Sequence, residues 1–497
     1  MIVSPKGIVR AVLAAGGGAA LVYAAVHAPG AVALGPTSNA DTSRDGGTRT
    51  VRSAALVCPG PELKGLAGID DLPVDVTVAA SAAPVRALTG LSLPSQDGTF
   101  SLTDLDGGSA RAKTTARGLV SQAQLTKPSA VLLRGEQSMA PGLAAAQSWL
   151  VTEGDHRGLG MTSCGSPSAD AWLIAGAGAA GRQERLVLTN PGENPVTVDL
   201  TLHGAKGIVD SPVGKGIVVP SRGRTVVLLD SIAGTEGSPA VHVVAQGGEV
   251  HAVLNDYWLD GSIAAGSDDA VAAAAPSRDQ VIPAVALAGS AALRVVVPGH
   301  GEGVVQARAL TPSGPRALPK DGVVRVAGGS VRDISLNGLP AGTYGLQVRA
   351  DVPVVAGAVV QRRTAATAVG DFAWTASTPA IRGAAGTPLP SQTIADKPLD
   401  RSLALTSSGD TAGVEVVTTD ASGKASSRRL TVGADSSATV DLTGATSVWV
   451  HRLSGKGQVR AGVVVGGSDA KGALVTVLPL KDAVLRTTNV GLLEVPQ

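Results

Sequence analysis

The chain of 497 residues is too long for one ordinary domain, and its length alone predicts about three or four. It carries 41 basic and 40 acidic residues, for a formal net charge of +1. No dense run of lysine and arginine gives the electrostatic footprint of a nucleic-acid-binding protein. Aromatic residues make up only 2% of the chain, too few for the stacking platforms that bind single strands. We therefore expect no nucleic acid among its partners.

Residues 1–34 have the pattern of an export segment. Lys6 and Arg10 precede an uncharged and largely apolar stretch, as in a secretory signal. Residues 31–33 read Ala-Val-Ala, which matches a signal-peptidase site, whereas residues 11–33 are long enough to cross a bilayer as a transmembrane anchor. Cleavage and anchoring both stay open. In either case we expect an exported protein, secreted or anchored in the cell membrane with an extracellular C-terminal body.

The two cysteines, Cys58 and Cys164, predict one disulfide. A pair of cysteines in an exported chain is usually oxidised. The bond would close a loop of about 106 residues, which in the chain-entropy model stabilises the fold by roughly 4–5 kcal/mol.

The sequence repeats itself with a period of about 105 residues. Three copies open alike, with a strand, a glycine-containing turn and a second strand: RLVLTNPGENPVTVDL, ALRVVVPGHGEGVVQARAL and SLALTSSGDTAGVEVV. A third matching piece in each copy brings Val226, Val331 and Thr439 to equivalent places. The segment before the first clear copy is interpreted as a degenerate copy, because its middle does not align.

The repeat predicts an all-β protein. Polar and apolar residues alternate, as in TVDLTLH, and turns recur about every 8–12 residues over roughly 100 residues per copy, which favours tandem immunoglobulin-like β-sandwich modules. The alternative is a β-propeller-like assembly, although propeller blades usually repeat every 40–50 residues or so.

The domain boundaries follow from the repeat. Residues 35–52 are small and polar and predict a flexible tether. A first β-rich module, closed by the disulfide, is expected over 53–168. Three β-sandwich modules are expected over 169–275, 276–371 and 372–497.

The densest group of chemically active side chains is Glu153, Asp155, His156 and Arg157. If the protein is an enzyme, these are the catalytic candidates, and a cell-wall hydrolase or transferase with its site between the first two modules is the most plausible activity. The other interpretation is architectural, with Asp155 and Arg157 fixing a turn and His156 exposed. We favour the architectural interpretation, because no chemical group recurs with the repeat.

His242 and His251 are weak candidates for a metal site. A two-residue hairpin turn between Gln246 and Glu249 would place both histidines on one face, about 7 Å apart. Zinc takes three or four ligands, and only Asn255 shares that face, so we expect no metal. No cofactor is expected either.

Two further patterns favour ordinary structure over binding. Tyr257 and Trp258 end a strand beside a loop and could form a small binding platform, but one large aromatic per module is commonly a core anchor. Asp268 and Asp269 could touch a cation, although a solvated acidic turn is the simpler interpretation.

The stretch APGLAAAQSW…GDHRGLGMTSC…ADAWLIAG…ERLVLTNPG resembles an actinobacterial family of exported proteins of unknown function, DUF5719. The matching positions are Ala140–Leu143, Gln147, Gly154–Leu159, Cys164, Trp172 and Asn190–Pro191. The resemblance implies an N-terminal membrane segment and an extracytoplasmic β-rich body, and it carries no activity across.

These observations predict a non-catalytic protein of the cell envelope. The β-modules are expected to act as a protein-interaction or spacer scaffold, with an envelope protein or a cell-surface glycan as partner and the membrane reached through the N-terminal segment. The alternatives are a cell-wall polysaccharide-binding protein and a cell-wall hydrolase or transferase.

Overall fold

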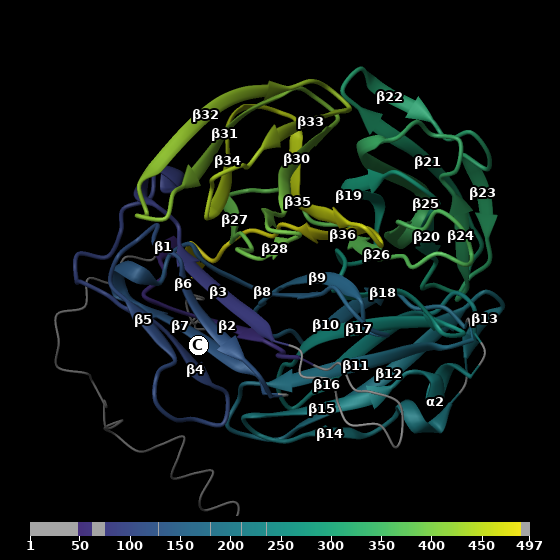
Figure 1. Cartoon of the computed structure of the whole chain (residues 1–497), viewed down its shortest axis with the longest axis horizontal. Coiled ribbons are helices and arrows are strands. Elements are labelled where there is room, and N and C mark those ends of the chain that lie inside the picture. The colour runs from purple at the N-terminus through teal and green to yellow at the C-terminus, as the bar shows by residue number, and fades with distance from the viewer. Residues whose placement is uncertain are drawn as a thin grey trace, which may run out of the picture. The chain divides into compact units, whose positions relative to one another are not determined.

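Strand follows strand through the part of the chain that the structure describes (Figure 1). The structure, a computed structural model, describes residues 48–61, 75–127, 129–178, 180–209, 211–234 and 236–488. The expected export segment and most of the expected tether lie outside these residues. Within them, no helix is long and apolar enough to cross a membrane. The only helices in this part are short: η1 (Val85–Leu88), η2 (Gln137–Met139), η3 (Pro212–Gly214) and α2 (Asp230–Ala233).

The prediction of an all-β protein is confirmed, and the strands fall into four consecutive segments. The first segment holds β2 (Ser53–Cys58), β3 (Val76–Ala82), β4 (Phe100–Asp104), β5 (Ala112–Thr114), β6 (Ser121–Leu125), β7 (Val131–Glu136), β8 (Leu143–Val151) and β9 (Gly158–Ser163). The second holds β10 (Asp170–Ile174), β11 (Arg182–Asn190), β12 (Val196–Gly204), β13 (Gly207–Val209), β14 (Ile217–Val219), β15 (Gly223–Leu228), β16 (Ala240–Gln246), β17 (His251–Asp260) and β18 (Ile263–Val271).

The other two segments follow the same plan. The third holds β19 (Ser277–Leu287), β20 (Ala291–Val296), β21 (Gly303–Thr311), β22 (Gly314–Ala317), β23 (Val323–Val326), β24 (Val331–Ser335), β25 (Gly342–Gln361) and β26 (Phe372–Ala376). The fourth holds β27 (Ala384–Pro388), β28 (Thr393–Ile394), β29 (Lys397–Pro398), β30 (Asp400–Ser408), β31 (Ala412–Thr419), β32 (Ala425–Val432), β33 (Ser436–Asp441), β34 (Ser447–Gly455), β35 (Gln458–Asp469) and β36 (Gly472–Pro479).

Strand order is the same in every segment. The short strands β14 and β23 and the hairpin β28-β29 are additions to this plan and are left out of the count. Counted along the chain without them, one sheet has the order first, sixth, third, fourth and the other has the order fifth, second, seventh, eighth, as in β2-β7-β4-β5 and β6-β3-β8-β9. In the third segment, the long β25 serves as both the sixth and the seventh strand. Val226, Val331 and Thr439 all lie on the fifth strand. The first segment has this order too, so it is a full copy of the repeat.

The immunoglobulin-like part of the prediction is not confirmed. In an immunoglobulin domain, the first strand lies in the sheet of the second strand and the seventh lies in the sheet of the sixth. Here, β10 pairs with β16 and β17 pairs with β11, so the first and seventh strands have exchanged sheets. The structure is not a propeller either, because each repeat forms two sheets that share a core and not a single blade.

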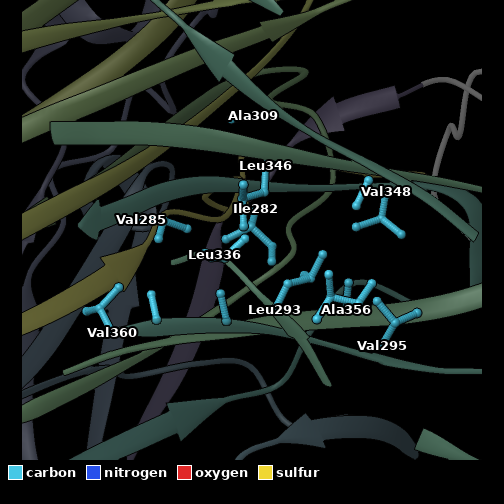
Figure 2. Close-up of a cluster of buried hydrophobic side chains, with 14 of the residues drawn as sticks. Ile282, Val285, Leu293, Val295, Ala309, Leu336, Leu346, Val348, Ala356 and Val360 are labelled. Atoms are coloured by element: carbon cyan, nitrogen blue, oxygen red, sulfur yellow. The ribbon is translucent and has the colours of Figure 1, made fainter. Parts of the chain in front are cut away.

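Small aliphatic side chains fill the core of each segment. In the third segment, Ile282 and Leu346 come from one sheet and Leu293 and Ala356 from the other, and these four side chains meet in a fully buried cluster (Figure 2). Alternation along each strand sends every second side chain inward. Valine and alanine therefore suffice for these cores, and few aromatic residues are needed.

Two glycines accommodate two of the buried tryptophans. Trp149 on β8 lies directly opposite Gly160 on β9, and Trp449 on β34 lies opposite Gly386 on β27. A Cβ atom at position 160 would stand 2.0 Å from the Trp149 ring, and one at 386 would stand 2.3 Å from the Trp449 ring. The indole rings thus occupy the space that a side chain on the neighbouring strand would need.

We expect Gly160→Ala to lower the free energy of unfolding by about 1–3 kcal/mol, because overpacking forces a buried ring from its place. Chemical denaturation monitored by tryptophan fluorescence measures this change. Gly301→Ala is the matched control, since no atom lies within 4 Å of a Cβ built there, and its effect should stay within about 0.5 kcal/mol. Equal losses from the two variants would contradict the proposed packing.

The four segments are parts of one compact unit, Thr48–Thr488. Their eighth strands contact one another in turn: β9 contacts β18, β18 contacts β26, β26 contacts β36, and β36 contacts β9. Each of these strands is the terminal strand of its sheet, so four sheet edges meet inside the protein. We call this meeting point of β9, β18, β26 and β36 the central junction.

Two expected boundaries differ from the structure. Residues 48–52 were assigned to the flexible tether, but β1 (Thr48–Thr50) pairs with β37 (Arg486–Thr488). Each of these strands gives the other partners for its backbone N–H and C=O groups. The boundary between 371 and 372 separates β26 from the third segment, yet β26 pairs with β25 and belongs to that segment.

Candidate functional site

The cluster Glu153–Arg157 lies where the first segment meets the second and the fourth. Arg157 is 1% exposed, and its Nη2 donates to Asp469 Oδ1 at 2.8 Å and to the carbonyl oxygen of Gly472 at 2.9 Å. Glu153 forms an ion pair with Lys471 on the same turn. The cluster therefore joins the end of the first segment to the turn between β35 and β36.

The aromatic residues beside this cluster are buried, which corrects two expectations. His156, expected to be exposed, is 5% exposed, and its ring lies 4.5 Å from that of Tyr257. Tyr257 is 2% exposed and donates its hydroxyl hydrogen to the carbonyl oxygen of Asp155 at 3.1 Å. Trp258 is partly buried, with the guanidinium groups of Arg182 and Arg363 each 5.4 Å from its ring. Tyr257 and Trp258 therefore do not form an exposed binding platform.

Three aspartates lie buried at the central junction. Asp371 Oδ2 accepts the backbone N–H of Val475 on β36 at 2.9 Å and that of Leu159 on β9 at 3.3 Å. Asp268 Oδ2 accepts the backbone N–H of Trp374 on β26 at 2.7 Å. A buried edge strand has backbone N–H groups without a neighbouring strand, and each needs an acceptor. These carboxyl groups supply it and hold the four segments together.

The third aspartate, Asp269, faces side chains of the first and second segments. Its Oδ2 accepts from the Thr162 hydroxyl at 2.5 Å, and its Oδ1 accepts from the Asn255 amide at 3.0 Å. The solvated acidic turn expected for Asp268 and Asp269 is thus wrong, because both residues lie within β18. Their position inside the apolar run IAAGSDDAVAAAA was the signal of burial that the sequence offered.

Burial changes the acid–base behaviour of this cluster. Removal from water raises the pKa of the Asp371 carboxyl to about 8 and raises the pKa of Asp268 well above its ordinary value, since the charged form of a carboxyl loses most by desolvation. Asp269 is shifted in the same direction, and its hydrogen bonds oppose the shift. The Asp371 carboxyl is therefore protonated and uncharged near neutral pH, and it accepts its hydrogen bonds without placing a charge inside the protein.

We expect the stability of the wild type relative to Asp371→Asn to fall as the pH rises from about 4 to about 8. The folded protein keeps the Asp371 proton over this range, whereas the unfolded chain releases it near the ordinary pKa of 3.8. Because the folded state binds one more proton than the unfolded state, the free energy of unfolding falls as the pH rises. We expect a change of about 2 kcal/mol, since relaxation around buried charges moderates the effect. Urea denaturation of both proteins at pH 5, 6.5 and 8 measures it. A difference that does not vary with pH would contradict the burial argument.

His242 and His251 do not share a face, which corrects the expected hairpin. His242 lies on β16, where it pairs with Trp172 and Thr201, whereas His251 lies on β17 in the other sheet. His242 stacks on Trp172 with 4.2 Å between ring centroids and hydrogen-bonds Asp170 at 2.9 Å. Among the residues that the structure describes, no group of three or more histidine, cysteine, aspartate or glutamate side chains could hold a metal ion.

A cavity of about 360 Å³ opens beside the central junction, between the first, second and fourth segments. Cys164 lines it, and the disulfide joins this residue to Cys58 as the sequence predicts. Trp172, His251 and Lys481 line it as well, together with many small side chains. Sequence reasoning did not find this cavity, because its walls come from three repeats and no local motif marks it.

The fold and the site define an all-β protein of four repeats held together by buried polar contacts. A sequence pattern of DUF5719, described as a family of unknown function, matches residues 119–443. The chain belongs to this family.

Comparisons with other proteins add little. None of the curated proteins matches the sequence. A tetra-tandem repeat from the extending region of a large adhesion protein matches at 13% identity, with 80% of this chain and 94% of the other covered and a TM-score of 0.09. An α-L-rhamnosidase of Streptomyces avermitilis, complexed with L-rhamnose, matches at 9% identity over 86% of this chain and 57% of that one, with a TM-score of 0.12. Such TM-scores carry no argument about this protein.

Proposed function

We propose that the protein is a non-catalytic scaffold of the cell envelope, exported by its N-terminal segment and anchored in the membrane or secreted. The observation that supports this proposal is that residues of the cluster Glu153–Arg157 contact other segments. Arg157 and Glu153 contact the fourth segment, and Asp155 accepts a hydrogen bond from Tyr257 of the second. The side chains of Glu153 and Arg157 are thus engaged in joining segments, as a rigid spacer requires, and Asp155 takes part through its backbone carbonyl.

The disulfide is consistent with an extracytoplasmic location, since such bonds persist in oxidising compartments. We further propose a protein partner, bound at the outer sheet edges such as β5, β22 and β32, each of which is terminal in its sheet. An exposed edge can pair with an extended segment of another protein. A glycan partner would call for more aromatic side chains than this chain carries.

An activity assay tests the non-catalytic part of the proposal. The full chain and a variant with Asp155→Asn and His156→Phe are incubated with peptidoglycan and with arabinogalactan, and released sugars are measured. We expect no turnover by either protein. Hydrolysis by the wild type that the double variant has lost would overturn the proposal and establish the enzyme alternative.

Location is tested on intact cells. A chain with a C-terminal epitope should be accessible to added protease in whole cells, whereas a cytoplasmic control protein should be protected. Protection of both proteins would overturn the export part of the proposal.

A further inference from the structure

We propose that the cavity beside the central junction binds a small organic anion, a carboxylate that also carries hydroxyl groups, with Lys481 binding the carboxylate and His251 accepting a hydroxyl hydrogen. This inference goes beyond the scaffold function, which needs no small ligand. It depends on the shape of the cavity and on the unused hydrogen-bonding capacity of two side chains.

The cavity has the dimensions of a ligand site. Its volume of about 360 Å³ falls within the range of about 300–1,000 Å³ that small-molecule pockets occupy. Its wall is built from small residues on separate strands, among them Ala145, Gly165, Ala252 and Gly386.

Lys481 provides an uncommitted positive charge. Its Nζ donates to the carbonyl oxygen of Ala272 at 2.7 Å, and an ammonium group has three N–H bonds, so two remain for a ligand. Lys481 is exposed to solvent and lines the cavity, so its ammonium group can be reached from the water-accessible space. The surrounding protein atoms partly desolvate the ammonium and lower its pKa to about 8, and a bound anion would favour its charged form.

His251 provides a hydrogen-bond acceptor. It is 9% exposed and lines the cavity, and its Nε2 has no hydrogen-bond partner among the residues that the structure describes. The other ring nitrogen donates to the backbone of Ser163, and burial lowers the pKa of the imidazole to about 4. The ring is therefore neutral, with a lone pair on Nε2. A buried acceptor without a partner is costly, and a small rotation of the ring toward the cavity would let a ligand hydroxyl satisfy it.

The two acidic residues that line the cavity are held by hydrogen bonds within the protein. The Asp482 carboxylate accepts the backbone N–H groups of Arg382 and Gly383 at 2.8 and 3.1 Å, and Asp170 is paired with His242. Both carboxylates thus have hydrogen-bond partners of their own within the protein. Lys481 and His251 are then the lining groups with hydrogen-bonding capacity to spare. Lys481 can bind one anionic group, and His251 can accept one hydroxyl hydrogen.

Calorimetric titration of the full chain tests the proposal with D-glucuronate, which carries both groups. D-glucose has hydroxyls without the charge, and acetate has the charge without a hydroxyl. We expect glucuronate to bind at least tenfold more tightly than either. Lys481→Met should reduce the affinity for glucuronate at least tenfold, and the matched control Lys456→Met, on the exposed β34–β35 hairpin, should leave it unchanged.

The role of His251 has its own measurement, because a substitution at this buried position can perturb folding. Glucuronate should shift the imidazole NMR signals of His251 in the wild-type protein, whereas acetate should not. Absence of glucuronate binding, or binding that Lys481→Met leaves intact, would overturn the proposed site. Equal binding of acetate and glucuronate, or an unshifted His251, would overturn the part assigned to the hydroxyl group.

Discussion

Replacing Arg157 by alanine should lower the free energy of unfolding by about 3–5 kcal/mol, the range seen when one partner of a buried ion pair is removed. The Arg157 side chain is 1% exposed and that of Asp469 is 16% exposed. Without the guanidinium, Asp469 loses its charge partner and the carbonyl oxygen of Gly472 loses a donor. Both groups belong to the fourth segment, so the contact between this segment and the first should weaken most.

Urea denaturation measures the loss, and hydrogen exchange locates it at β9 and β36. Arg157→Lys should recover part of the stability. Lysine restores the positive charge but lacks the planar guanidinium that donates to both Asp469 and Gly472. Arg325→Ala is the matched control, since it breaks an ion pair with Glu302 whose side chains are 72% and 52% exposed, and exposed pairs contribute about 0–1 kcal/mol. An Arg157 variant as stable as the Arg325 variant would refute the role given to this contact.

The class of fold was predictable because strand alternation is a local property. Each strand carries its own pattern of inward and outward side chains, and the period of the repeat follows from comparing one stretch with another. Strand order is different, because the choice between β11 and β16 as the neighbour of β10 depends on contacts far along the chain. Nothing in the sequence of β10 indicates which sheet it joins, and this is where the immunoglobulin-like prediction failed.

The sequence predicted the architectural role of the cluster Glu153–Arg157 better than it predicted the partners of individual side chains. The position of Arg157 at the end of a module was inferred from the repeat, but its partner Asp469 lies in another copy. The hairpin expected for His242 and His251 failed for the same reason, since consecutive strands separate into different sheets. Asp371 was missed because a lone aspartate before an apolar strand is an ordinary sequence feature, and only the meeting of four sheet edges gives it a function.

Removing the disulfide, with Cys58→Ala and Cys164→Ala together, should lower the free energy of unfolding by about 4–5 kcal/mol. The bond closes a loop with a sequence separation of 106 residues, and a loop of this length carries a large closure entropy in the unfolded chain. Because Thr48–Thr488 is one compact unit, we expect the loss to appear in the unfolding of the whole unit.

The contact between the chain segments around positions 58 and 164 should persist in the folded variant. The entropic origin of the stabilisation by the disulfide can therefore be tested. Val57 and Gly165 beside the disulfide exchange two backbone hydrogen bonds, at 2.9 and 3.0 Å, and these hold the strand ends together without the sulfur atoms. The variant should therefore keep the circular dichroism of the wild type and lose denaturant resistance. Dithiothreitol should destabilise the wild type by a similar amount and leave the variant unchanged. Unfolding midpoints that coincide for the two proteins would refute the stabilising role of the bond, whereas a variant that folds differently would show that the disulfide also selects the native contact between β2 and the residues after β9.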